Sequence, residues 1–132
     1  MTITLMDTSV AVPLLLSSHP DHALVASWAK GKDLAFAGHA TFETYAVLTR
    51  LPVDSRLTPT QAQQLIAQFA DSEHPLTTSH QEAVRLMATL NITGGQVYDG
   101  LVALSAINQK LATRDQRAHD LYRKLGVEVE IV

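Results

Sequence analysis

Residues 3–9 read ITLMDTS, a short apolar run followed at once by an acid and two hydroxyl side chains. A run of this length with polar residues at its end predicts a buried strand. A second stretch of the same kind, LATRD at residues 111–115, ends in a hydroxyl, a base and an acid. Open parallel sheets bind ligands beyond the carboxyl ends of their strands. We therefore expect Asp7 and Asp115 to meet at one edge of a sheet.

Strand-like and helix-like segments alternate along the whole chain, and this alternation predicts a parallel sheet covered by helices on both faces. The expected fold is α/β, a three-layer α/β/α sandwich with a central, mostly parallel five-stranded sheet. Its strands are expected at residues 3–6, 34–37, 76–78, 111–112 and 127–131. A chain of 132 residues has the usual size of one domain, so residues 1–132 are expected to form a single domain.

Prolines and capping residues predict where helices begin. Pro20 suits the first turn of a helix that is expected to pack by its Leu24 and Trp28 side. Thr58 followed by Pro59 is typical of a cap and first helical position. Three aromatic side chains are expected in the core because aromatic residues make up only 5% of the chain. These are Trp28, Phe69 and Tyr98.

Two further helices are expected in the second half of the chain. Thr78 or Ser79 caps the first of them. Its expected apolar face consists of Ala83, Val84, Met87 and Leu90. Gly94 and Gly95 break the helical pattern and predict a turn before the second helix.

The composition predicts a compact globular protein, because 46% of the residues are hydrophobic and 17% are charged. Cysteine is absent, which leaves no disulfide or thiolate metal site and fits a reducing compartment. The longest apolar stretch, residues 10–16, contains Pro13 and is too short to span a bilayer. We expect a cytoplasmic protein without a membrane segment.

Four acidic residues stand at the ends or starts of the expected elements. Asp7 and Asp115 follow expected strands. Glu43 lies at the start of the helical run at residues 41–51, and Asp99 lies in the first turn of the helix expected after Gly95. Carboxylate oxygens suit Mg²⁺ or Mn²⁺, which are hard cations. Clustered carboxylates raise one another's pKa until a cation neutralises them. The four acids therefore predict a divalent-metal site that could hydrolyse phosphodiesters through an activated water.

Three of these acids also have a purely structural explanation. Asp7 and Asp115 could cap the helices that follow them, because a short oxygen-bearing side chain accepts from free backbone N–H groups. Glu43 could answer the dipole of its helix. Asp99 resists such an explanation, because it shares a helical face with Ala103 and Ala106 and would be buried without a partner.

Other polar residues near the acids are weaker candidates. Thr8 and Ser9 could hold a metal-bound water or could serve only as caps. Arg114 and Arg117 could contact an RNA phosphate, although arginines at a helix start are often simply solvated. The six histidines lack the spacing of zinc ligands and are expected at the surface. The net charge of −3 neither indicates nor excludes nucleic-acid binding, since four of the acids would be neutralised by metal.

Four segments carry a resemblance to a known family: LMDTSV, TFETYAVLTRL, VYDGLVALSA and LATRDQRAHDLYRKLGVEV, in this order. The chain resembles PIN-domain ribonucleases, specifically the VapC-type toxins of toxin–antitoxin pairs. By this resemblance the metal-binding, catalytic quartet is formed by Asp7, Glu43, Asp99 and Asp115. Thr113 matches the polar residue that supports the quartet.

The resemblance also implies an activity and partners. It implies Mg²⁺- or Mn²⁺-dependent endonucleolytic cleavage of single-stranded or structured RNA, often tRNA or rRNA. It also implies silencing by a cognate VapB-type antitoxin, and a homodimer. The chain departs from the family where many relatives have a further acid, because Gln116 and Arg117 follow Asp115. Asp120 lies one turn later and is expected to face solvent. Gly100 stands where alanine is common, which could loosen the helix by up to about 1 kcal/mol.

Three other functions are alternatives to a ribonuclease. An aspartyl-phosphate phosphatase, a phosphoesterase acting on another substrate, would need a second acid two residues after Asp7, and Ser9 stands there. A receiver-like, non-catalytic module would need a lysine at the end of a late strand, where Thr113 and Arg114 stand. An inactive α/β interaction partner is the third, and the four intact acids argue against it.

Overall fold

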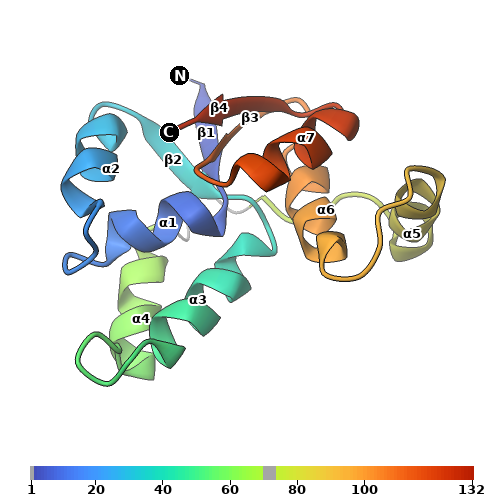
Figure 1. The fold of residues 1–132 in the computed structure, drawn as a ribbon. Helices are drawn as coiled ribbons and strands as arrows, with labels where there is room; N and C mark the ends of the chain where they lie inside the picture. Colours follow the sequence, from blue (N-terminus) through green and yellow to red (C-terminus); the bar gives the residue numbers. More distant parts are fainter. Residues whose placement is uncertain (1, 70–73) are drawn as a thin grey trace.

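The computed structural model describes residues 2–69 and 74–132, and within them strands and helices alternate as expected (Figure 1). The strands are β1 Ile3–Met6, β2 Asp33–Phe36, β3 Lys110–Thr113 and β4 Glu128–Ile131. The helices are α1 Thr8–Leu15, α2 His22–Ala29, α3 Ala40–Arg50, α4 Pro59–Ala67, α5 His80–Thr89, α6 Gln96–Leu104 and α7 Gln116–Lys124.

The four described strands form one parallel sheet in the order β2-β1-β3-β4. Leu5 in β1 is in register with Ala35 in β2 on one side and with Leu111 in β3 on the other. The first strand is therefore central, although it opens the chain. This order brings the ends of β1 and β3 side by side, as the two quoted stretches predicted.

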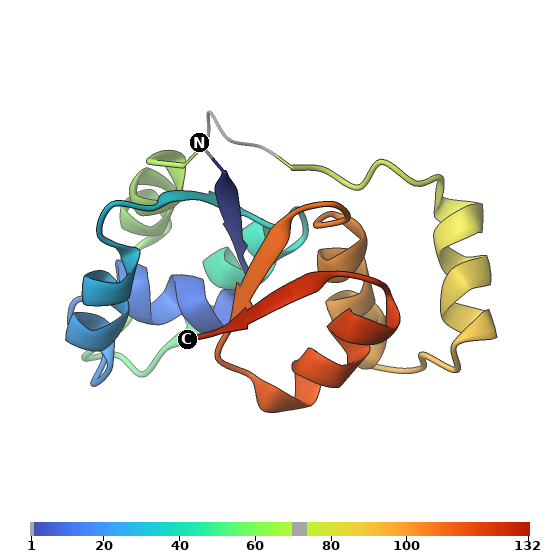
Figure 2. The same cartoon turned by 90° about the horizontal axis from the view of Figure 1, so that it is seen from above.

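Both faces of the central strands are covered. Leu5 and Met6 are adjacent in β1 and point to opposite faces, yet both are fully buried. Leu111 and Ala112 in β3 are also fully buried. Figure 2 shows the helices distributed around the sheet. Strands buried on both faces read as continuous apolar runs, which is why the sequence reveals them.

The prediction of a strand at residues 76–78 is wrong. These residues form no strand, and the described sheet has four strands rather than five. Only Leu76 in this segment packs against the core, and Pro75 before it has no N–H to donate to a ladder. One partly buried apolar residue after a proline can look like a short strand in the sequence, although the segment pairs with none of the described strands. The other expected strands agree with the structure to within one residue at each end.

Two expected helix faces need correction. In α2 the fully buried residue is Val25, whereas Leu24 is 55% exposed, and Pro20 lies ahead of the helix rather than in its first turn. In α5 Ala83 and Met87 are buried, but Val84 is 66% exposed. Adjacent helical positions differ by about 100° in direction, so a short helix that touches the core along one narrow line leaves neighbouring apolar residues outside.

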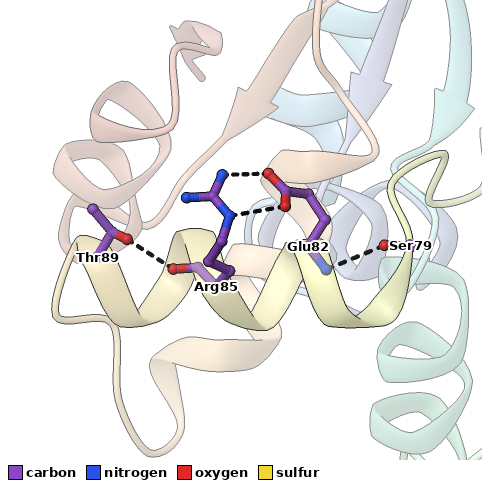
Figure 3. A network of polar contacts seen from close by, with 4 residues as sticks. All are labelled: Ser79, Glu82, Arg85 and Thr89. Carbon is purple, nitrogen blue, oxygen red and sulfur yellow. Dashed lines mark hydrogen bonds and ion pairs between the residues drawn. The ribbon is translucent and has the colours of Figure 1, made fainter.

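Capping chemistry fixes the starts of α4 and α5. Thr58 and Gln61 form a reciprocal capping box, with Pro59 at the first helical position. The Ser79 hydroxyl accepts from the Glu82 N–H, as Figure 3 shows. In the same helix the Arg85 guanidinium pairs with the Glu82 carboxylate. Helix α5 lies at one end of the molecule, apart from the sheet (Figure 2).

The helices of the described chain are short. None is both long enough and apolar enough to cross a membrane.

Candidate active site

A cavity of about 260 Å³ lies beyond the carboxyl ends of β1 and β3. All four predicted acids line it. The lining residues are Asp7, Thr8, Ser9, Glu43, Asp99, Val102, Asp115 and Tyr122. They come from the starts of α1 and α7, from α3 and α6, and from the interior of α7. Residues far apart in sequence are thus brought to a single site by the parallel topology.

Asp7 is placed by the last hydrogen bonds of the sheet. Its backbone N–H donates to the carbonyl of Ala112 in β3 at 3.2 Å, and its carbonyl begins the hydrogen bonding of α1. Its side chain accepts from the Ser9 N–H at 3.0 Å, so Asp7 is the N-cap of α1. The capping explanation of Asp7 is therefore confirmed, and it coexists with a position in the cavity.

The Asp7 carboxylate is almost fully buried, at 4% exposure, and is surrounded by hydroxyl groups. The Ser9 hydroxyl donates to Oδ1 at 2.6 Å, and the Tyr122 hydroxyl donates to Oδ2 at 2.9 Å. Burial raises the pKa of Asp7, while the neighbouring hydroxyl groups of Ser9, Thr113 and Tyr122 act in the opposite direction. These donors favour the ionised form of Asp7, which is the form that can bind a cation.

Ser9 and Thr113 connect the two strand ends. The Ser9 hydroxyl accepts from the Arg114 N–H at 2.7 Å and lies 3.3 Å from the Thr113 hydroxyl oxygen. The Thr113 hydroxyl in turn accepts from the Asp115 N–H at 3.0 Å. Asp115 then caps α7 by accepting from the Arg117 N–H at 2.9 Å. A continuous polar network therefore fixes Asp7 and Asp115 relative to one another.

Glu43 and Asp99 complete the acidic lining from two helices, each in a first turn as the sequence predicted. Burial raises the pKa of Glu43, with a contribution from the charge of Asp7. Burial, followed by the charges of Glu43, Asp115 and Asp7, raises the pKa of Asp99 to about 6. The neighbouring carboxylates therefore contribute to the raised pKa of both Glu43 and Asp99, as the sequence predicted.

The oxygen-rich lining fits a hard divalent cation. The Thr8 hydroxyl and Glu43 Oε1 are buried without a hydrogen-bond partner in the described structure, so each has acceptor capacity left for a ligand. No three acidic or histidine side chains among residues 2–69 and 74–132 lie close enough to hold one ion together. Mg²⁺ commonly takes only one or two carboxylates and keeps several waters, so this wider spacing remains compatible with it.

The arginines expected to contact RNA lie in different settings. The Arg114 guanidinium pairs with Asp21 Oδ2 at 2.9 Å and is only 23% exposed. The Arg117 side chain is exposed, and its backbone takes part in capping. Asp120 faces solvent as predicted, with 89% of its side chain exposed.

Two tyrosines lie where the sequence did not predict them. Tyr98 is 54% exposed and stacks on His39 with ring centroids 5.5 Å apart, so its predicted core position is wrong. Tyr122 was not singled out, although it is fully buried and lines the cavity. Its signal in the sequence was its position seven residues after Asp115, which places both on one side of α7.

A second, larger cavity of about 630 Å³ lies between α3, α4 and α6. Its lining is mainly apolar and aromatic, with Phe36, Phe42 and Phe69 among its walls, and it includes none of the four acids. The smaller cavity is therefore the candidate active site, because all four predicted carboxylates line it.

The fold is that of a PIN domain. The PIN domain family model matches residues 4–124, and the chain belongs to this family. It is 47% identical to Ribonuclease VapC27 of Mycobacterium tuberculosis over 129 residues, which cover 96% of this chain and 94% of that protein. It is 37% identical to Ribonuclease VapC40 of the same species over 130 residues, covering 96% of each chain.

Proposed function

We propose that this protein is a Mg²⁺- or Mn²⁺-dependent endoribonuclease. The observation that carries the proposal is the arrival of four carboxylates from separate elements at one small cavity beyond the strand ends. The relatives named as ribonucleases, which this chain matches over nearly its whole length, support the choice of RNA as substrate. The pKa of Asp99, raised to about 6 by burial and by the charges of the neighbouring carboxylates, also supports a functional site here.

In this proposal Asp7, Glu43, Asp99 and Asp115 hold the cation, directly or through water. A bound divalent cation would lower the pKa of a water molecule and stabilise charge on the leaving oxygen. Thr8 could orient that water, because its hydroxyl is buried at the cavity and has no partner in the described structure. Ser9 and Thr113 keep the Asp7 and Asp115 carboxylates in place through the network described above.

The proposed roles of the two arginines differ. Arg117, which is exposed beside the cavity-lining Asp115, is the better candidate for an RNA phosphate. Arg114 would first have to leave Asp21, so its proposed phosphate contact would come at the expense of that ion pair.

The partners and location are proposals from the family resemblance. We propose a VapB-type antitoxin as inhibitor, a homodimer, and a cytoplasmic location. Exposed Phe42, Tyr45 and Tyr98 offer apolar surface that a protein partner could cover.

The chemistry of the products tests the proposal. Purified, antitoxin-free protein is incubated with tRNA and rRNA in Mn²⁺, and the new ends are examined. Attack by water predicts a phosphate on one new end and a hydroxyl on the other, without a 2′,3′-cyclic phosphate. Cyclic phosphate ends would contradict the proposed attack by water. Hydrolysis of a small phosphomonoester without any RNA cleavage would favour the phosphatase alternative.

A further inference from the structure

The Asp7 carboxylate is held from two different helices. Ser9, in the first turn of α1, directs its N–H at 3.0 Å and its hydroxyl at 2.6 Å to Oδ1. Tyr122, near the end of α7, directs its hydroxyl to Oδ2 at 2.9 Å. Tyr122 is 1% exposed and Asp7 is 4% exposed, so this hydrogen bond is shielded from bulk water.

The two carboxylate oxygens are not equivalent. Each carboxylate oxygen can accept about two hydrogen bonds. Oδ1 already accepts two from Ser9, whereas Oδ2 accepts one from Tyr122. Oδ2 is therefore the oxygen better able to bind a cation, and its direction depends on the Tyr122 hydroxyl. The ordinary pKa of a tyrosine hydroxyl is about 10, so this hydroxyl is protonated at neutral pH and donates to the carboxylate.

Tyr122 also relates Asp7 to a second acid. Asp115 caps the start of α7, and Tyr122 lies seven residues later on the same helix. Both line the cavity. The hydroxyl contact therefore holds the helix that carries Asp115 against the strand end that carries Asp7.

We propose that Tyr122 is a positioning residue for the metal site, which orients Asp7 Oδ2 for cation binding. This inference rests on the proposed function, because it assumes that Asp7 binds a cation. In this proposal the hydroxyl acts through its hydrogen bond to Asp7. Groups that hydrogen-bond to metal ligands change metal affinity by about 10–100-fold when they are removed.

The first test is direct measurement of Mn²⁺ binding by calorimetry on the purified wild-type protein and on Tyr122→Phe. This substitution removes only the hydroxyl and keeps the buried ring. We expect the dissociation constant for Mn²⁺ to rise about tenfold. Tyr45→Phe is the matched control, since Tyr45 is partly exposed in α3 and does not line the cavity. A Tyr122→Phe dissociation constant equal to or below that of the wild type overturns the inference and leaves the proposed function intact.

A second measurement needs no variant to fold. The chain has three tyrosines, so tyrosine labelled with ¹³C at Cζ gives a simple spectrum. We expect the Tyr122 signal to move on titration with Mg²⁺ while that of Tyr45 stays fixed. A Tyr122 signal that is unchanged when the wild type is saturated with Mg²⁺ contradicts the inference. A wild-type protein that binds neither Mn²⁺ nor Mg²⁺ overturns the proposed function as well.

Discussion

The hydroxyl oxygens of Ser9 and Thr113 lie 3.3 Å apart, although 104 positions separate the two residues in the sequence. This contact lies where β1 and β3 end and where both following helices begin. Through it the caps of α1 and α7 form one hydrogen-bonded unit. The same groups therefore stabilise the helix starts and fix the acids of the cavity.

Replacing Thr113 by valine should destabilise the protein by about 1–3 kcal/mol, because the fully buried Thr113 hydroxyl accepts from the Asp115 N–H and lies 3.3 Å from the Ser9 hydroxyl, and both groups would lose this partner. Thr89→Val is the control, since its hydroxyl lies on the exposed surface of α5 (Figure 3). Urea unfolding measures both free energies of unfolding. A Thr113→Val protein as stable as the control would contradict the structural role of the network.

The stability of the metal-free protein should depend on Asp99. The folded-state pKa of Asp99 is raised from 3.8 to about 6, so the folded protein holds this proton more tightly than the unfolded chain. The contribution is present below pH 3.8 and is lost as the pH rises through about 6. Asp99→Asn should therefore weaken the loss of stability between pH 4 and pH 7, roughly the window set by these pKa values. The melting temperature of the wild type and of Asp99→Asn is measured across this pH range. Two curves that fall in parallel would refute this prediction.

Divalent cations should stabilise the protein by binding only to the folded state. Mn²⁺ at 100 times its dissociation constant should add about 2.7 kcal/mol, and a chelator should remove this gain. Asp7→Asn should abolish most of the gain, whereas Asp120→Asn, an acid with an 89% exposed side chain, should retain it. Thermal melts with and without Mn²⁺ measure the effect. Equal stabilisation of both variants would place the cation outside the cavity.

Gly100 should tolerate alanine. A Cβ at this position would lie 2.9 Å from Cε of Met87, which is the end of a flexible side chain in α5. Moving that methyl group offsets the gain of about 1 kcal/mol expected from replacing glycine in a helix. We expect Gly100→Ala to change the free energy of unfolding by less than about 1 kcal/mol, as measured by urea unfolding. A loss of more than about 3 kcal/mol would show that Met87 cannot move aside.

The sequence was most informative where one physical signal dominated. Central strands buried on both faces appear as apolar runs, so Ile3–Met6 was predicted to the residue. Thr58 was predicted as a cap, and Ser79 as one of two alternatives with Thr78, because such side chains accept hydrogen bonds from free backbone N–H groups. The convergence of the acids followed from the parallel topology, since strand ends share one edge.

The failures have tertiary causes. Leu24 and Val84 have the same hydrophobicity whether or not a partner covers them, and only packing decides which face is buried. Residues 76–78 have a strand-like composition but pair with no strand. Tyr122 was missed because a tyrosine in an amphipathic helix gives no local sign that its hydroxyl meets Asp7. The ion pair of Arg114 with Asp21 likewise joins positions that no sequence pattern links.

Mapping of new RNA 5′ ends tests the central claim most directly. Total RNA is incubated with Mn²⁺ and wild-type protein, Asp7→Asn or Asp120→Asn, and each reaction is repeated with a chelator. The account predicts discrete cuts with the wild type and with Asp120→Asn, and their loss with Asp7→Asn and with the chelator. Cuts that persist in Asp7→Asn, or no cuts from folded wild-type protein that binds Mn²⁺, would contradict a ribonuclease site at this cavity.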